Sequence, residues 1–202
     1  MSDDIIVSHA VTPFVSAYPW SAGFGAKYAN PATLPTGDGQ SVAFSPSGAD
    51  IAVGHATTPF ISVYPWSAGF GAKYANPATL PAGQCNGVAF SPSGADIAVA
   101  SYNTPYLLAY PWSAGFGAKY ANPATLPTGI GYSVAFSPSG DDIAVGHAST
   151  PYISVYPWSA GFGAKYADPI LIDRPPSTCT GVAFSPVAVL VRVDHLPLMN
   201  IG

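Results

Sequence analysis

The sequence predicts an all-β fold, and three observations support this prediction. Glycine and proline together make up 43 of the 202 residues (21 Gly plus 22 Pro), a density that would interrupt every long helix. Apolar residues account for 49% of the chain and charged residues for only 8%, so the chain can bury a hydrophobic core. The segments between the Gly and Pro turns are short, as β-strands are.

A repeat of 46 residues runs through the chain. The four tryptophans mark it at equal spacing, at Trp20, Trp66, Trp112 and Trp158. The block YPWSAGFGAKYANPATLP is identical in three copies, at 18–35, 64–81 and 110–127. The fourth copy diverges after Asp168, and an insertion of two residues delays its inner-strand residue, Phe184. Such exact self-similarity indicates an array of equal structural units.

Each repeat contains four strand-like segments, namely DIAVGH, PFISVYPW, KYANPATLP and GVAFSP. The two prolines of KYANPATLP suit an outer edge, because a central strand cannot accept proline. Four strands within 40 to 50 residues are typical of propeller blades. We therefore predict one β-propeller domain over 1–202, with about four four-stranded blades. Its repeat units are 4–49, 50–95, 96–141 and 142–188, and a degenerate strand and tail follow at 189–202.

The strand count leaves ring closure open, because the inner strand occurs four times and the second strand five times. Within one chain, Val182–Pro186 is expected to pair beside Ile5–Ala10, while Val189–His195 competes for the position of Ile5–Ala10. Alternatively, two chains share a propeller of about eight blades, or the chain is a shortened relative of a longer array. We prefer blade completion between copies, so a homo-oligomer is the first expected partner.

The composition argues against several other partners. Lys and Arg number only six, four of them one repeated lysine, so no basic stripe is available for nucleic acid. No apolar run approaches the roughly 18 residues that span a bilayer, and the first residues lack a secretion-signal pattern. We expect a soluble chain without a membrane partner. Cys85 and Cys179 fall two blades apart, so we expect free thiols rather than a disulfide.

Chemically versatile residues recur once per blade instead of gathering at one place. The GFGAKY turn lacks the third glycine of a dinucleotide fingerprint, and no helix is expected after it. The histidines share one repeat position, at His9, His55, His147 and His195. Equivalent turns point around a ring, so these side chains cannot converge on one metal ion. The chain has no Glu, and its aspartates begin strands. We expect no cofactor, no metal and no catalytic residue, and therefore no enzyme.

The repeats differ mainly in two turns. One follows the second strand and reads SHAVTPF, GHATTPF, ASYNTPY and GHASTPY; the other precedes the inner strand and reads TGDGQS, AGQCNG, TGIGYS and PPSTCTG. In a propeller both turns lie on the same face. Variation there is typical of a binding surface, although neutral drift in permissive turns explains it equally well. The candidate binding residues are His9, His55, Tyr102, Asn103, His147, Asp38, Gln84 and Tyr132.

The repeated aromatic residues allow a second functional hypothesis. Trp66, Phe70 and Tyr74 form one set per repeat and could stack sugars, which would make the chain a multivalent carbohydrate-binding propeller. Packing between blades is the competing explanation, because aromatic side chains bury the most surface per residue.

The segment VAFSPSGADIAVG resembles the inner strand, turn and second strand of WD-repeat propellers, and ISVYPW resembles their third strand. Tyr64 and Pro65 stand where that family has Trp-Asp, so the chain is WD-repeat-like. With its near-identical YPWSAGFG units, the chain also resembles the propeller arrays of bacteriophage and environmental viral sequences. The resemblance implies a non-catalytic structural or protein-interaction role in a virion, as a tail, fibre or capsid-decorating component.

Overall fold

The computed structural model describes residues 3–186, which form four antiparallel sheets. The first sheet has two strands, β1 (Asp3–Ser8) and β2 (Val15–Trp20). The second contains β3 (Gly39–Phe44), β4 (Asp50–His55) and β5 (Ile61–Pro65). The third contains β6 (Cys85–Phe90), β7 (Asp96–Ser101) and β8 (Leu107–Pro111). The fourth contains β9 (Gly131–Phe136), β10 (Asp142–His147) and β11 (Ile153–Pro157), and the 3-10 helix η1 (Leu171–Asp173) follows.

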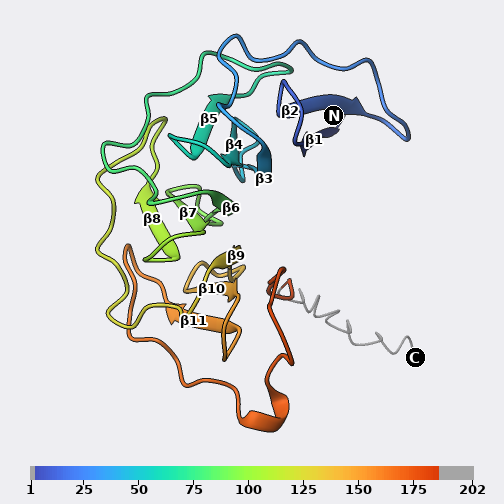
Figure 1. Cartoon of the computed structure of the whole chain (residues 1–202). Helices are drawn as coiled ribbons and strands as arrows, with labels where there is room; N and C mark the ends of the chain where they lie inside the picture. Colours follow the sequence, from blue (N-terminus) through green and yellow to red (C-terminus); the bar gives the residue numbers. More distant parts are fainter. Residues whose placement is uncertain (1–2, 187–202) are drawn as a thin grey trace, which may run out of the picture.

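The sheets stand side by side along an open arc, in the manner of propeller blades (Figure 1). The strands β3, β6 and β9 lie on the inner side of the arc, and β5, β8 and β11 lie on its outer side. Successive inner strands contact each other, β3 with β6 and β6 with β9. The predicted all-β fold with repeated blades is confirmed.

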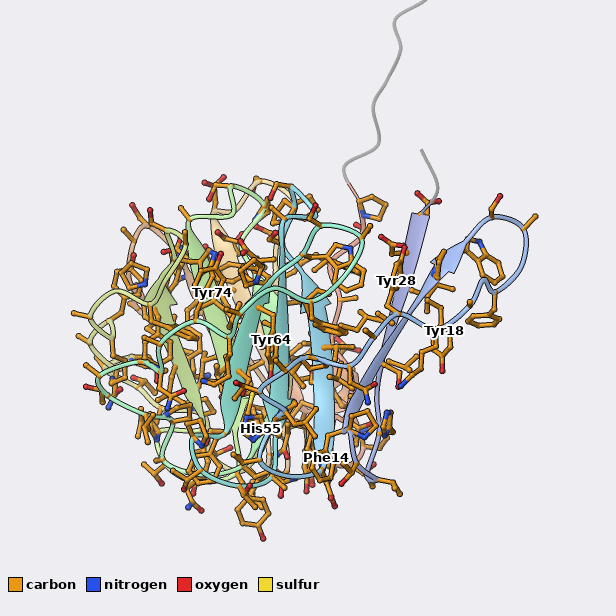
Figure 2. The ribbon with its side chains drawn as sticks, turned by 90° about the horizontal axis from the view of Figure 1, so that it is seen from above. Phe14, Tyr18, Tyr28, His55, Tyr64 and Tyr74 are labelled. Carbon is orange, nitrogen blue, oxygen red and sulfur yellow. The ribbon has the colours of Figure 1, made fainter. Side chains whose placement is uncertain are left out.

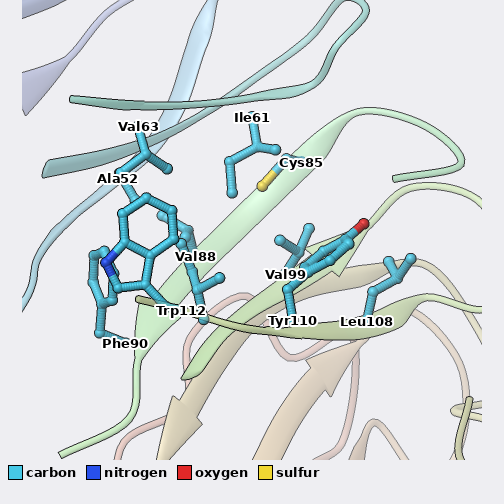
Figure 3. Packing of buried hydrophobic residues seen from close by; sticks show 11 residues of the cluster. Ala52, Ile61, Val63, Cys85, Val88, Phe90, Val99, Leu108, Tyr110 and Trp112 are labelled. Atoms are coloured by element: carbon cyan, nitrogen blue, oxygen red, sulfur yellow. The ribbon is translucent and has the colours of Figure 1, made fainter. Parts of the chain in front are cut away.

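The repeated sequence produces the same register in each blade. Val42 pairs with Val53 in the second sheet, and Val88 pairs with Val99 in the third. Side chains on alternate sides of the strands then face the two neighbouring blades. Figure 3 shows the resulting core between the second and third sheets, where Ile61 of β5 lies near Cys85 of β6. Contacts between blades therefore supply most of the buried apolar surface.

The fourth strand predicted for each blade is not formed, so the complete blades have three strands. The KYANPATLP segment runs along the outside as extended chain. In the second repeat it makes one backbone hydrogen bond to the outer strand, from Tyr74 N to Val63 O at 2.9 Å. The Tyr110 hydroxyl of the next blade then donates to Thr79 O at 2.9 Å. The prolines lack N–H donors, which prevents a continuous ladder.

The prediction that Val182–Pro186 pairs beside Ile5–Ala10 is wrong for the described structure, in which β1 pairs with β2 alone. The segment instead lies against the fourth sheet, where Val182 N donates to Ser133 Oγ at 3.2 Å. It thus continues the arc beyond the fourth sheet and does not reach β1 (Figure 1). The competing strand predicted at Val189–His195 lies outside the described residues.

Candidate interaction surface

The two variable turns of each blade meet at one end of its strands. In the second blade, Ala56 N donates to Asp38 O at 3.0 Å, and in the third, Tyr102 N donates to Gln84 O at 2.9 Å. Figure 2 shows His55 at this end of the molecule and Tyr74 toward the other. The structure thus places both turns on one face, as the sequence predicts. We call it the variable face; its turns span 9–14, 36–41, 55–60, 82–87, 101–106, 128–133 and 147–152.

An aromatic residue with a left-handed backbone closes each turn after the second strand. The φ angle is 68° at Phe14, 67° at Phe60, 65° at Tyr106 and 71° at Tyr152. Bulky residues rarely adopt this conformation, so the surrounding bonds must hold it. At Phe60 the amide donates to Thr57 O at 2.7 Å, and the carbonyl accepts from His55 N at 2.9 Å. The turns that follow the second strands therefore have a fixed backbone conformation.

The candidate residues differ in their access to solvent. Asp38 and Asn103 are exposed, and the Tyr102 side chain is 50% exposed. The Asn103 amide also donates to a backbone carbonyl across the turn at 3.1 Å, which limits its motion. Gln84 and Tyr132 are half-buried. A ligand approaching the variable face would therefore meet Asp38, Tyr102 and Asn103 first.

The histidines proposed for this surface belong mostly to the core, which corrects the prediction. His55 and His147 are fully buried, and each ring Nε2 lies close to a serine hydroxyl, at 3.1 Å from Ser62 and 3.0 Å from Ser154. Burial lowers the pKa of His55 to about 4 and also lowers the pKa of His147. The half-buried His9 makes the same contact to a serine. These histidine side chains therefore hold the variable turns against the adjacent strands.

Part of the variation between repeats is compensation of size across blade boundaries. A Cβ added to Gly54 would lie 2.5 Å from Cys85 Sγ, so a small residue must face the cysteine. At the boundary between the third and fourth blades the larger residue lies on the preceding blade, because Ala100 faces Gly131. A large residue on one blade is therefore matched by a small one on its neighbour. These positions vary for packing reasons and not for binding.

A polar bridge between blades escaped the sequence analysis, which treated the aspartates as strand-start residues. Asp4 accepts the Tyr28 hydroxyl of its own repeat at 2.8 Å and the Trp66 indole N–H of the next blade at 3.0 Å. The same pair of bonds recurs at Asp50 and Asp96. In the sequence, the constant separations of 24 residues from Asp to Tyr and 62 residues from Asp to Trp could have revealed this bridge.

The tryptophans of the second, third and fourth blades pack between blades and do not form a sugar-stacking shelf. Trp66, Trp112 and Trp158 are only 6–8% exposed. The Trp66 ring meets Phe70 and Tyr28 edge to face, with centroid distances of 5.0 Å for both pairs. Their faces are thus covered by protein, and packing explains why these residues are repeated.

Other kinds of site are not built from the described residues. Between residues 3 and 186, no three His, Cys, Asp or Glu side chains gather where they could bind a metal ion. In the same part of the chain no helix has the length and apolar character needed to cross a bilayer. Cys85 and Cys179 are both free thiols. The GFG turn closes on itself, with Gly71 N donating to Pro65 O at 2.8 Å.

No protein-family model and no curated protein matches the sequence. Among solved structures, the chain is similar to the hydrazine synthase of Kuenenia stuttgartiensis, with a TM-score of 0.52 and 13% sequence identity. The likeness covers 71% of this chain and 39% of that chain, so this chain matches well under half of the other protein's length. At this identity the comparison shows the fold alone, which is propeller-like.

Proposed function

We propose that this chain is a non-catalytic structural and protein-binding β-propeller that contacts its partner through the variable face. The observation that carries the proposal is the contrast between identical blades and their differing exposed turns. Asp38 and Gln40 are exposed on the second blade, whereas Tyr102 and Asn103 are exposed on the third. Loops that differ on a uniform scaffold are a common way to build a binding surface.

Tyr102 is the centre of the proposed contact. Its half-exposed ring offers apolar area together with a hydroxyl, a combination that is enriched at protein interfaces. Asn103 beside it supplies polar groups, and the fixed turn reduces the entropy lost on binding. The low overall charge of −4 favours recognition by shape and hydrogen bonds over electrostatic steering.

The proposed place of this chain is a virion, as a tail, fibre or capsid-decorating component. This part of the proposal rests on the sequence resemblance to viral repeat arrays. Support for it also comes from the repetitive architecture, which suits a structural part with many equal contacts.

A photo-crosslinking amino acid at Tyr102 tests the proposal, with the same group at Ala95 on the opposite face as control; both positions are exposed. In particles that contain the chain, we expect crosslinks to another structural protein from position 102 and none from position 95. Equal crosslinking from both positions, or crosslinks at neither, would overturn the proposal.

A paired variant, Tyr102→Ala with Asn103→Thr, sharpens the test. It introduces the residues that the second repeat carries at Ala56 and Thr57, so the turn is expected to fold normally. We expect at least a tenfold loss of affinity for the crosslinked partner. A glycan that binds the chain and shifts in affinity with this variant would instead support the carbohydrate-binding alternative, now centred on Tyr102.

A further inference from the structure

Each internal tryptophan occupies a socket with three walls, which is a repeated feature of the blade boundaries. The Trp66 indole donates to Asp4 Oδ2 of the preceding blade at 3.0 Å. Its ring packs edge to face on Tyr28 of that blade, with centroids 5.0 Å apart, and on Phe44 of its own inner strand, at 6.0 Å. Trp112 and Trp158 repeat these contacts.

Trp20 has the side chain but not the socket. Within residues 3–186 its indole has no carboxylate acceptor, and its ring is half-buried and packs on Phe24. At the other end of the arc, the repeat spacing assigns the equivalent socket residues to Asp142, Tyr166 and Phe184. Asp142 Oδ1 accepts the Tyr166 hydroxyl at 2.9 Å, while no indole of the described chain reaches Oδ2. Tyr166 is accordingly 49% exposed.

Among residues 3–186, no inner strand pairs with the edge of β1, unlike in the other three sheets. Val7 is 39% exposed, whereas the equivalent residues Val53, Val99 and Val145 are fully buried. The segment 178–186, at the other end of the arc, has the sequence of an inner strand but pairs with no second strand of the described chain. Its position is that of an inner strand, because Val182 N bonds Ser133 Oγ just as Val88 N bonds Ser41 Oγ in the chain's interior. An unpaired edge is a template for strand addition.

The turns after the inner strands show the same complementarity. A Cβ built on Gly94 would lie 3.7 Å from Pro46 of the preceding blade, and Gly140 has the same relation to Pro92. Gly48 has no such neighbour in the part of the chain that the structure describes, and a hollow of about 340 Å³ opens beside it. It is lined by Asp3, Asp4, Phe44, Gly48 and Trp66. Pro186 is the proline of the unpaired inner-strand segment.

From these three matching pairs of surfaces we infer that two copies of this chain join head to tail. Trp20 of one copy enters the socket formed by Asp142, Tyr166 and Phe184 of the second copy. The segment 178–186 of the second copy completes the two-stranded sheet of the first, with Val182 opposite Val7 and Pro186 in the hollow beside Gly48. Each copy carries both halves, so two junctions close a ring of about eight blades.

This inference rests on the proposed interaction role but concerns the ends of the arc and not the variable face. Light scattering coupled to size exclusion is the first test, and we expect twice the chain mass of 20.6 kDa. A mass of 20.6 kDa at every concentration would overturn the inference. If the chain is a monomer but still binds its partner through Tyr102, this inference fails and the proposed function holds. If the chain is a dimer but does not bind through Tyr102, the proposed function fails and this inference holds.

Two variants locate the junction. Val7→Lys places a charge on an edge that is exposed in the separate chain and buried in the pair, and Trp20→Ala removes the inserted ring. Both are expected to give monomers with an unchanged far-UV circular dichroism spectrum. Val11→Lys is the matched control, because Val11 is 73% exposed and lies outside the junction. A dimer that persists in Val7→Lys and Trp20→Ala would contradict the assignment.

Mixing experiments separate assembly from misfolding. Trp20→Ala keeps an intact socket, and Tyr166→Ala keeps an intact Trp20, so a mixture of the two can form one complete junction per pair. We expect mixed dimers where each variant alone is monomeric. If the mixture remains monomeric, the head-to-tail contact is wrong.

The thiol of Cys179 reports on the same junction. Its internal equivalent, Cys85, is fully buried, whereas Cys179 is only half-buried in the single chain. We expect the reaction of Cys179 with a thiol reagent to slow at least tenfold as the dimer forms and to recover in Val7→Lys. Protection of Cys179 in a monomer would show that another part of the same chain fills the position, which overturns the inference.

Discussion

The indole N–H of Trp112 donates to Asp50 Oδ2 at 3.1 Å and thereby joins the third blade to the second. The other carboxylate oxygen, Oδ1, accepts the Tyr74 hydroxyl at 2.9 Å. A carboxylate has only acceptors and can satisfy both donors at once. One aspartate per repeat therefore fixes the position of its own outer segment and of the next blade.

Asp50→Asn tests the strength of this bridge. The amide keeps the shape of the side chain but turns one acceptor into a donor that faces a donor, so we expect the free energy of unfolding to fall by about 2 kcal/mol. Urea denaturation followed by circular dichroism measures the loss. Asp38→Asn is the control, because Asp38 is exposed and bonds through its backbone carbonyl. Equal stability of the two variants would refute the bridging role.

Gly54→Ala probes the compensation of size between blades. The added methyl group would lie 2.5 Å from Cys85 Sγ, so we expect a destabilisation of about 1–3 kcal/mol from overpacking. Adding Cys85→Gly recreates the combination found at Ala100 and Gly131, and should recover part of the lost stability. A double-mutant cycle measured by thermal unfolding checks this, and additive effects would argue against the pairing.

Stability is expected to depend on pH through His55. Its folded-state pKa of about 4 lies below the ordinary value of 6.5, because burial disfavours the charged ring. The stabilisation is complete above pH 6.5 and is lost as the pH falls toward 4, by on the order of 3 kcal/mol. His55→Ser, which copies the serine found at Ser101, should flatten this dependence in urea titrations. Parallel curves for both proteins would exclude His55 as the cause.

Cys85 is expected to be inert in the folded protein. The side chain is fully buried, and burial raises the pKa of the thiol, which suppresses the reactive thiolate. In a Cys179→Ser variant, labelling with a thiol reagent should be at least a hundredfold slower in buffer than in denaturant. Fast labelling in buffer would mean that the boundary between the second and third blades opens readily.

The variable face illustrates what sequence comparison between the repeats could and could not predict. The differing turns were found from the sequence because most of the remaining positions are identical between the first three repeats. Whether each difference is functional depended on burial, since Tyr102 is exposed while Ala100 packs on Gly131. His55 was assigned to the surface because it lies in one of the variable turns, and its complete burial reversed that assignment.

The sequence by itself determined the period, the three strands of each complete blade and the all-β class, because these depend on alternation, turn residues and chain spacing, all of which are local. Only the tertiary structure decided how the repeats meet. The bridge from Trp112 to Asp50 joins residues 62 positions apart. The open arc leaves β2, which ends at Trp20, in its first sheet and β10, which begins at Asp142, in its last sheet. Such contacts depend on the relative placement of whole blades, which the local pattern of one repeat does not contain.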